Sequence, residues 1–558
     1  MASLLVGAFG AARAADPTPS PTPSPAPSGT PATTSSQTPS PEPSPTSSPT
    51  ATPSGQARLG LGPETVAADD YGQLARGKAV SVDVLRNDTC ENKTPCPRAT
   101  LAAFVLTSVP AGWTATITPG TGVVTVRVPA SATPGVRYVG YGIRDSKGTG
   151  ANARLAVRVV IPPKDSYNPV QGTYFSHPFR KAYKYRIRDV ILRTINSVPY
   201  GGQIRIASWS FSSYAYRTAL FAAKQRGVSV QIVLSNRNTP AVSDWNALRR
   251  MFGTTNVISR DKGSWVYKCV YSCRGVSGTM HSKIFMFSRS ATTPWVVMTG
   301  SANLTDFAVT SQWNQMSVVT RNQAVWNDTL NVFYQLRADR PASPQYVEKT
   351  YPDRKLLFYP RGAPVPENDF LVTQLRGVKC TGAATANGRT QIRIAMYAWY
   401  QNRGRWLANR VRTLWNQGCD IRIVYGIMGN GIKNQLYSPT GRGRIPMRQI
   451  LLTNKEEEPI YYIHDKWVAI YGNVWGKANA TTVLQGSFNF SDLGFRSDEN
   501  FEQRWGLGLY RGYIRDFGIL WTEPQARAPS PTSVITNVDR STGSPTLGRG
   551  AYTYMSTD

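Results

Sequence analysis

The residues best suited to chemistry are two histidines, each followed at the second position by a lysine. His281 precedes Lys283 and His464 precedes Lys466, in a chain of 558 residues that has only three histidines. A Gly-Ser-x-Asn sequence follows each pair, with its serine 20 residues after the first of these histidines and 23 after the second. Imidazole, ammonium, hydroxyl and amide groups together form a site for an anion, where the imidazole can act as nucleophile or acid. The candidate catalytic residues in the two sets are His281, Lys283, Ser301, Asn303, His464, Lys466, Ser487 and Asn489.

The first pair adjoins an apolar stretch, residues 284–287, which indicates a buried strand. Alternate side chains of a strand point to the same face, about 7 Å apart, so His281 and Lys283 are expected to point the same way. A second strand is predicted at 295–298, and the first Gly-Ser-x-Asn sequence follows it. We therefore expect its N–H groups, hydroxyl and amide at the end of the sheet that carries the histidine.

An internal repeat connects the two sets. Residues 203–207 read QIRIA, and the same five letters recur 188 positions later. The two histidines are 183 positions apart, and the two motif serines are 186 positions apart. In each copy an apolar helical pattern ends at a glycine, Gly227 or Gly418, and a second strand follows at 230–234 or 421–425. Such similar offsets predict a duplicated strand–helix–strand lobe.

Two such lobes related by a pseudo-twofold axis would bring both histidines to one cleft. One imidazole could then attack the phosphorus of a phosphodiester, while the other protonates the leaving oxygen on the opposite side. The lysines and the motif asparagines would neutralise the phosphate oxygens, so we expect no metal ion and no other cofactor. The chain would be active alone, with both lobes forming the site.

The paired motifs resemble those of the phospholipase D superfamily over residues 170–525. The resemblance implies two pseudo-symmetric lobes, each a mixed sheet flanked by helices, and a covalent phosphohistidine that water or an alcohol resolves. It carries over to the eight residues above and adds Glu499, at the acidic position that supports a histidine in many members. Asn314 is the expected counterpart in the first lobe, and His281 is the expected nucleophile by analogy. His177 lacks the motif and is interpreted as structural.

One departure concerns an aspartate that the family often carries after the lysine. Ser288 and Tyr471 occupy its two positions in this chain. A relative that only binds its ligand is therefore kept as an alternative. Such a protein would not need to retain both histidines, both lysines and both asparagines, and this favours catalysis.

Ahead of the repeat, short alternating segments separated by turn signals predict a β-sandwich. These segments are 79–85, 122–128 and 153–160. The sequences at 69–71, 82–88 and 140–145 resemble bacterial immunoglobulin/cadherin-like modules of cell-surface proteins. No catalytic constellation is visible there, so we expect a spacer or an adhesion module.

The predicted fold class is α/β, preceded by an all-β domain. An apolar run with a small-x-small ending at the N-terminus is typical of a secretory signal, so the mature protein is expected outside the cell or on its wall. No later run reaches about 18 apolar residues, and no transmembrane helix is expected. The predicted order is a signal peptide at 1–15, a Pro/Thr/Ser-rich linker at 16–57, the sandwich at 58–165, phospholipase D-like lobes at 166–348 and 349–525, and a loose tail at 526–558.

Six cysteines support export, because an even count in an exported protein predicts disulfides. Six cysteines allow 15 connectivities, but short spacings favour local couples. The favoured couples are Cys90 with Cys96, Cys269 with Cys273, and Cys380 with Cys419. A zinc site at the middle couple is disfavoured, since no second cluster completes four ligands.

The net charge of +30 and the pI near 10.0 predict attraction to anionic partners. These are a phospholipid or membrane surface as substrate, nucleic acid, or anionic polymers of the cell wall. The leading hypothesis is a secreted phospholipase D-type phosphodiesterase that splits a phosphatidylcholine-like lipid into phosphatidate and head group. A metal-independent endonuclease of the same superfamily and a non-catalytic wall-polymer binder remain as alternatives. Five aromatic residues lie near the predicted strand ends, and they have two interpretations: they line a lipid cleft, or they pack in the core. They are Trp209, Phe211, Tyr397, Trp399 and Tyr400.

Overall fold

The computed structural model describes residues 65–241, 243–254, 263–455 and 459–529, together with two short strands in the tail. The predicted signal peptide and linker lie outside these residues. In the predicted loose tail, β28 (Asn537–Asp539) pairs with β29 (Ser544–Thr546), and Arg527 exchanges two backbone hydrogen bonds with Gln449 (2.8 and 2.9 Å). None of the helices in the described ranges is long and apolar enough to span a membrane.

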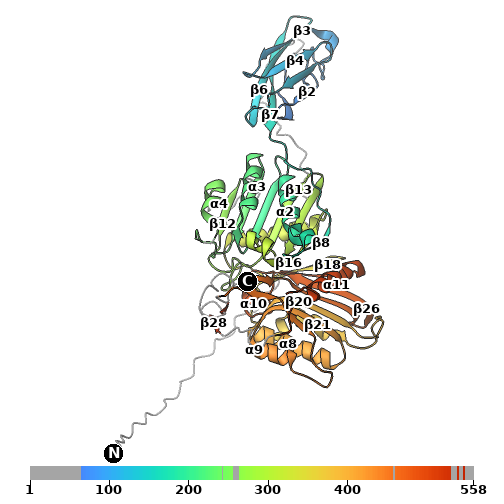
Figure 1. The fold of residues 1–558 in the computed structure, drawn as a ribbon. Coiled ribbons are helices and arrows are strands. Elements are labelled where there is room, and N and C mark those ends of the chain that lie inside the picture. The colour runs from blue at the N-terminus through green and yellow to red at the C-terminus, as the bar shows by residue number, and fades with distance from the viewer. Residues whose placement is uncertain are drawn as a thin grey trace, which may run out of the picture. The chain divides into compact units, whose positions relative to one another are not determined.

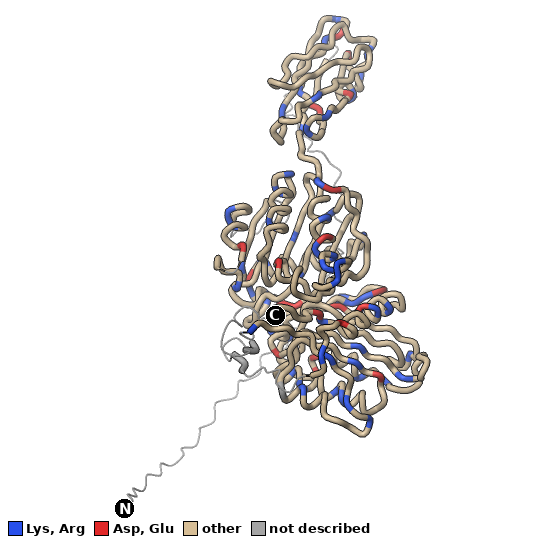
Figure 2. The backbone as a smooth tube through the Cα atoms, viewed as in Figure 1, with Lys and Arg blue, Asp and Glu red and all other residues tan. Residues whose placement is uncertain are grey.

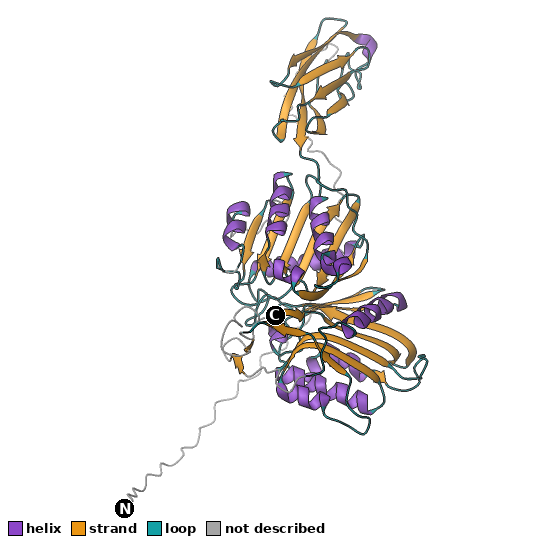
Figure 3. Cartoon of the chain, in the orientation of Figure 1, coloured by secondary structure: helices purple, strands orange, loops and turns teal. Residues whose placement is uncertain are grey.

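The alternating segments near the N-terminus fold into strands of two sheets (Figure 3). One sheet has the order β1-β7-β6-β3 and the other β2-β5-β4. Every second residue of β5 and β7 is buried, and one hydrophobic cluster takes residues from both sheets, as alternation requires of strands with one face inward. The immunoglobulin/cadherin-like character remains a prediction. The elements are β1 (Asp70–Ala75), β2 (Ala79–Asp83), a 3-10 turn (Arg98–Thr100), β3 (Leu101–Ser108), β4 (Thr114–Thr118), β5 (Val123–Arg127), β6 (Gly135–Asp145) and β7 (Gly150–Val160).

The rest of the chain is a mixed α/β structure, as predicted, built on two nine-stranded sheets (Figure 1). The first has the order β12-β11-β9-β13-β14-β16-β24-β23, with β8 also paired to β16. Its strands are β8 (Gly172–Ser176), β9 (Gln203–Ser208), β11 (Ser229–Leu234), β12 (Trp265–Lys268), β13 (Lys283–Ser290), β14 (Thr293–Gly300), β16 (Gln312–Val319), β23 (Leu451–Thr453) and β24 (Pro459–Ile463). A separate two-stranded sheet joins β10 (Phe211–Ser212) to β15 (Leu304–Thr305).

The second sheet has the order β17-β18-β27-β26-β25-β20-β21-β22, with β19 also paired to β25. Pair by pair, β9–β11 and β20–β21 are both parallel, whereas β9–β13 and β20–β25 are both antiparallel. The pairs β13–β14 and β25–β26, and then β14–β16 and β26–β27, are antiparallel as well. The order and direction of these strands therefore recur in the second sheet. Its strands are β17 (Val347–Thr350), β18 (Arg354–Phe358), β19 (Val378–Lys379), β20 (Gln391–Trp399), β21 (Asp420–Met428), β22 (Met447–Gln449), β25 (Lys466–Val474), β26 (Lys477–Gly486) and β27 (Asn500–Arg504).

Helices cover both faces of each sheet. Apolar residues of α2 and α3 pack on one face of the first sheet and those of α6 on the other, while α7 and α8 oppose α11 across the second. The two predicted helix ends are confirmed: Gly227 follows α3 with φ of 84° and Gly418 follows α8 with φ of 99°, a conformation that favours glycine. The helices are α1 (Lys181–Lys184), α2 (Arg186–Asn196), α3 (Tyr214–Gln225), α4 (Trp245–Phe252), α5 (Asp306–Thr310), α6 (Gln323–Ala338), α7 (Phe370–Arg376), α8 (Gln401–Asn416), α9 (Asn430–Tyr437), α10 (Leu493–Arg496) and α11 (Leu507–Trp521), with a 3-10 turn (Pro366–Asn368) before α7.

Three disulfides join the cysteines in the predicted local couples. They are Cys90–Cys96, Cys269–Cys273 and Cys380–Cys419. Both sulfur atoms of the middle couple are in the disulfide, so neither is available as a thiolate ligand for zinc.

Candidate active site

Each candidate histidine stands directly before a central strand of its sheet. The prediction that His281 lies inside the strand is wrong by two residues, because β13 begins at Lys283 and β25 begins at Lys466. In both sets the lysine Nζ donates to the carbonyl oxygen of the histidine, at 2.9 Å in the first and 2.8 Å in the second. All four residues are at most 2% exposed. The local geometry of the two His-x-Lys segments is therefore nearly the same.

His281 is held by a carboxylate from the other sheet. Its Nδ1 lies 2.8 and 2.9 Å from the two carboxylate oxygens of Glu499, and both side chains are 3% exposed. Ser487 Oγ donates to the same carboxylate. A carboxylate only accepts, so Nδ1 is the donor in this contact, and the lone pair of the neutral ring is on Nε2.

His464 is held by an amide in the same way. Its Nδ1 lies 2.9 Å from Asn314 Oδ1, which also accepts from Ser301 Oγ at 2.8 Å. The orientation of the amide is set by its nitrogen, which donates to Ala308 O at 3.2 Å. The two histidines thus differ in one respect, because a charged oxygen holds the first and a neutral oxygen holds the second.

These contacts cross between the two sheets in both directions. Glu499 precedes β27 of the second sheet and holds the histidine before β13, whereas Asn314 of the first sheet holds the histidine before β25. Backbone hydrogen bonds cross in the same way: His281 N donates to Asp498 O at 3.0 Å, and His464 N donates to Trp313 O at 2.9 Å. Each half of the site is consequently completed by the other half of the chain.

Two residues that the sequence reasoning missed fix the lysine ends of these segments. Asn500 Oδ1 accepts from the backbone N–H of Lys283 at 2.7 Å, and Gln315 Oε1 accepts from that of Lys466 at 3.3 Å. They follow Glu499 and Asn314 directly, and they are 185 positions apart. That offset matches the repeat, and it is the signal that could have found them.

The glycines of the two Gly-Ser-x-Asn sequences allow close packing of strands. A Cβ at Gly300 would overlap the carbonyl oxygen of Gln315, and one at Gly486 would overlap that of Asn500. Close approach lets Ser301 N donate to Gln315 O at 3.0 Å, and the second serine makes the equivalent 2.9 Å bond. The serine hydroxyls are thereby placed beside the groups that hold the histidines.

An aromatic ring stands beside each His-x-Lys pair. Trp209 lies 5.9 Å from the His281 ring and Tyr397 lies 5.3 Å from the His464 ring, measured between centroids. Each is also within 6 Å of the neighbouring lysine Nζ, at 5.7 and 5.1 Å, and the two are 188 positions apart. Tyr462, which the sequence reasoning missed, lies 6.0 Å from His464. Phe211 and Trp399 are fully buried in two hydrophobic clusters, while Tyr397 and Tyr462 share a third with Tyr400 and are at most 2% exposed.

The motif asparagines, Asn303 and Asn489, are each 4% exposed, and Asn303 lines a small cavity with Ala308 and Val309 of α5. The site thus contains two imidazoles held at Nδ1, two ammonium groups and two amides. This combination can bind a phosphodiester, transfer the phosphoryl group to a histidine and protonate the leaving oxygen.

Comparison with known families identifies part of this region. Residues 191–336 match the family model described as "Cardiolipin synthase, PLD-like domain". This segment is therefore similar to a phospholipase D-like domain. It contains the first motif set and Asn314, and it supports the resemblance predicted from the motifs over that segment. No curated protein matches the chain.

Solved structures offer only distant likenesses. Polyphosphate kinase from Porphyromonas gingivalis is 14% identical with a TM-score of 0.42, over 63% of this chain and 51% of that one. The chain therefore spans about half the length of that kinase. Nuc from Salmonella typhimurium, a phospholipase D family member, is 21% identical (TM-score 0.23), over 31% of this chain and 96% of its own. NucT from Helicobacter pylori is 17% identical (TM-score 0.24), over 30% and 96%. At these scores none of them bears on function.

Ser288 and Tyr471, which replace the family aspartate, have structural contacts. Ser288 Oγ accepts from Gln203 N at 2.9 Å, at the start of β9, and Tyr471 OH donates to Ala384 O at 3.0 Å. Neither contacts a histidine in the described part of the chain. Glu499 supplies the acidic partner of His281 from a different strand.

His177 belongs to a separate buried cluster. Its Nε2 lies 2.8 Å from Asp516 Oδ1 of α11, and both side chains are at most 2% exposed. Asp465, between His464 and Lys466, is 1% exposed and interacts electrostatically with Asp516. Burial raises the pKa of Asp516, and burial together with the Asp516 charge raises the pKa of Asp465 well above its usual range. Asp465 directly follows His464, so this buried cluster adjoins the second motif set.

The segment that carries Glu499 is braced by the Cys269–Cys273 loop. The carboxylate of Asp498 accepts from Cys273 N at 2.5 Å and from Arg274 N at 3.1 Å. Complete burial raises the pKa of Asp498 to about 7, and the Arg274 charge opposes this shift. The loop thereby positions the backbone carbonyl that bonds His281 N.

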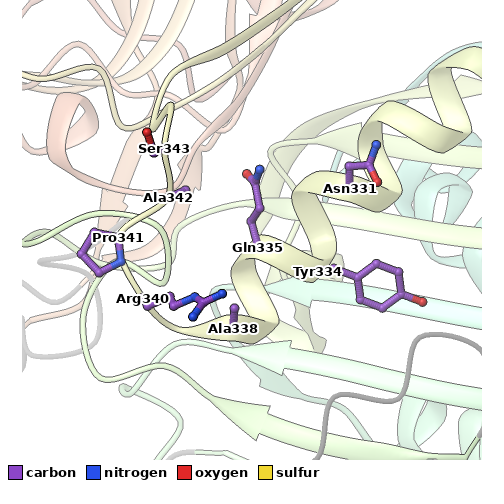
Figure 4. A pocket seen from close by; sticks show the side chains of 8 residues that line it. All are labelled: Asn331, Tyr334, Gln335, Ala338, Arg340, Pro341, Ala342 and Ser343. Carbon is purple, nitrogen blue, oxygen red and sulfur yellow. The ribbon is translucent and has the colours of Figure 1, made fainter. Parts of the chain in front are cut away.

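A cavity of about 740 Å³ lies away from these residues, between α6 and the segment after it (Figure 4). Gln335, on its wall, accepts a 2.9 Å bond from Arg274 Nε. None of the candidate catalytic residues lines it. The lining residues are Asn331, Tyr334, Gln335, Ala338, Arg340, Pro341, Ala342 and Ser343.

Proposed function

We propose that this protein cleaves phosphodiester bonds through a covalent phosphohistidine, and that its two α/β halves are a duplicated phospholipase D-like pair. The observation that carries the proposal is the exchange of Nδ1 partners, in which Glu499 holds His281 and Asn314 holds His464. Two imidazoles held in this way present the same ring nitrogen, Nε2, for chemistry. Residues from both halves are needed, so neither half has a complete site alone.

In the first step His281 Nε2 attacks phosphorus, and the bond from phosphorus to the leaving oxygen breaks. The leaving oxygen takes the proton of His464 Nε2 as it departs. The ammonium groups of Lys283 and Lys466 and the motif amides neutralise the phosphate oxygens as charge develops on them. The products of this step are the free alcohol and the phosphohistidine.

In the second step the neutral His464 takes a proton from an incoming water, whose oxygen attacks phosphorus. The nitrogen–phosphorus bond breaks, and His281 is regenerated with its lone pair. An alcohol in place of water gives transfer to a new head group. The two steps use the same groups in reverse, so no further residue is required.

The assignment of His281 as the nucleophile is supported by its carboxylate partner. Imidazole gains positive charge as it attacks phosphorus, and the anionic Glu499 stabilises that charge more than a neutral amide does. His464, held at Nδ1 by Asn314, must release its Nε2 proton to the leaving group, and a neutral amide stabilises the imidazolium less than a carboxylate would, so that proton leaves more readily. The asymmetry therefore fits one nucleophile and one acid.

The proposed substrate is a phospholipid, split into phosphatidate and head group outside the cell. Three disulfides support an oxidising compartment. The aromatic rings of Trp209, Tyr397 and Tyr462 beside the two histidines suit a lipid or a cationic head group. A nuclease is the second candidate, and the net charge of +30 favours it.

Purified protein incubated with phosphatidylcholine vesicles and with plasmid DNA, both in EDTA, tests these proposals. We expect choline release and a trapped phosphohistidine, and we expect both to disappear in His281→Asn. His177→Asn is the matched control, because it removes a buried histidine outside the site. DNA nicking without choline release would establish the nuclease, and an unaffected His281→Asn variant would refute the mechanism.

A further inference from the structure

The strongest concentration of positive charge beside the site is on α1 and the start of α2 (Figure 2). Five cations fall within residues 180–188, and only Arg180 and Arg188 have ion-pair partners, Glu523 and Asp189. Lys181, Lys184 and Arg186 form no ion pair with any described residue. An uncompensated charge of this density attracts an anionic surface.

This charged segment adjoins the catalytic residues. Lys184 and Arg188 line one small cavity with Asn303 of the first motif set and with residues of α5. Phe307 in α5 is 40% exposed, and its ring lies 5.8 Å from Tyr462, which neighbours His464. Residues of α1, α2 and α5 therefore form a rim beside Asn303 of the first motif set and beside Tyr462, the neighbour of His464. We call Lys181, Lys184, Tyr185, Arg186, Arg188 and Phe307 the α1–α5 rim.

Exposed aromatic rings accompany the cations of the rim. Tyr185 is 39% exposed, and the Arg188 guanidinium lies 3.9 Å from its ring centroid. The guanidinium already covers one face of this ring, which leaves at most one face for base stacking. An exposed ring surrounded by cations is better suited to the head-group layer of a membrane. There the rings of tyrosine and phenylalanine insert, and the cations bind lipid phosphates.

We propose that the α1–α5 rim docks the protein on an anionic phospholipid surface and so presents lipid phosphodiesters to the two histidines. This inference rests on the proposed phosphodiesterase function and names the surface that delivers its substrate. The cations supply long-range attraction, which salt screens, and Phe307 with Tyr185 supplies shallow apolar insertion.

Docking is measured in the His281→Asn background, so that vesicles are not consumed. Sedimentation is compared for vesicles of phosphatidylcholine with and without phosphatidylglycerol, and binding to a single-stranded oligonucleotide is measured in parallel. The rim variant is Lys181→Glu, Lys184→Glu and Arg186→Glu. The matched control, with the same charge change on exposed residues of α4 and β13, is Arg249→Glu, Arg250→Glu and Arg289→Glu.

Each cation near an anionic surface strengthens binding about fivefold, so we expect the rim variant to bind anionic vesicles at least about tenfold more weakly than the parent. The affinity of the control variant should change little. With His281 restored, both variants should hydrolyse the soluble diester bis(4-nitrophenyl) phosphate like the parent. Equal vesicle binding by rim variant and control would overturn the inference, as would rim-dependent binding of the oligonucleotide alone. Rim-dependent docking without head-group release would leave the docking surface standing and refute the phospholipid substrate.

Discussion

Replacing Glu499 by glutamine separates charge from geometry at the proposed nucleophile. The carboxylate oxygens lie 2.8 and 2.9 Å from His281 Nδ1, and an amide oxygen can accept the same bond. Ser487 Oγ now donates to the carboxylate, but it can turn to Asn500 O, 3.3 Å away, and accept from the new amide nitrogen. The variant therefore gives His281 the kind of partner that His464 already has.

The expected loss of transition-state stabilisation in Glu499→Gln follows from the removed charge alone. Two unit charges about 4 Å apart interact by about 4 kcal/mol at an effective dielectric constant of about 20. Only part of a full positive charge develops on the imidazole in the transition state, so we expect a loss of about 2 to 4 kcal/mol. This corresponds to a chemical step about 30 to 1,000 times slower.

Single-turnover kinetics with acid or base quench measure this step, and the phosphohistidine is trapped and weighed by mass spectrometry. Asn314→Asp is the companion variant, and combined with Glu499→Gln it moves the carboxylate to His464. We expect the combined variant to form phosphohistidine at His464. A Glu499→Gln variant within threefold of the parent, with unchanged thermal stability, would refute the electrostatic reasoning.

Three further predictions concern stability and packing. The pKa of Asp498 is about 7 in the folded protein against an ordinary value of 3.8, so between these pH values the folded state holds a proton that the unfolded state has lost. Stability should therefore fall as pH rises through this window, and thermal melts of Asp498→Asn should show a weaker pH dependence than the parent. Gly300→Ala should lower both stability and activity because its Cβ would overlap a carbonyl, whereas Gly508→Ala in α11 meets nothing within 4 Å and should be neutral or stabilising by up to about 1 kcal/mol in urea melts. Replacing both Cys380 and Cys419 by serine opens a loop of 39 residues, and denaturant unfolding should show a loss of about 4 kcal/mol. A loss below about 1 kcal/mol would contradict the loop-entropy account.

Local sequence signals predicted much of the fold because they depend on neighbouring residues. The apolar run of β9 and its repeat in β20 indicated buried strands, and Gly227 indicated the end of α3. The Cys90–Cys96 and Cys269–Cys273 couples were predictable for the same reason, since separations of 6 and 4 residues keep the ends of these loops close. Strand starts were less predictable, and His281 lies outside β13 because the chain there bridges to Asp498 of the other half.

Local sequence patterns could not predict the contacts between the two halves. Gln315 and Asn500 have no unusual local sequence, and only the 185-residue offset connects them. Their role appears when β16 and β27 approach the segments of the opposite half. Tyr462 was missed for a different reason: it lies within β24, two residues before His464, and the apolar letters of that strand do not show that its ring approaches the imidazole.

The sequence by itself determined which chemical groups the site contains. The spacing of histidine, lysine, serine and asparagine, twice over, is a property of short segments and of the repeat. Only the tertiary structure decided that Glu499 serves His281 and Asn314 serves His464, across 218 and 150 residues of chain. The physical reason is that an imidazole bonds whatever acceptor the packing of the two sheets brings to Nδ1. That packing depends on the apolar surface buried throughout both halves and not on any local pattern.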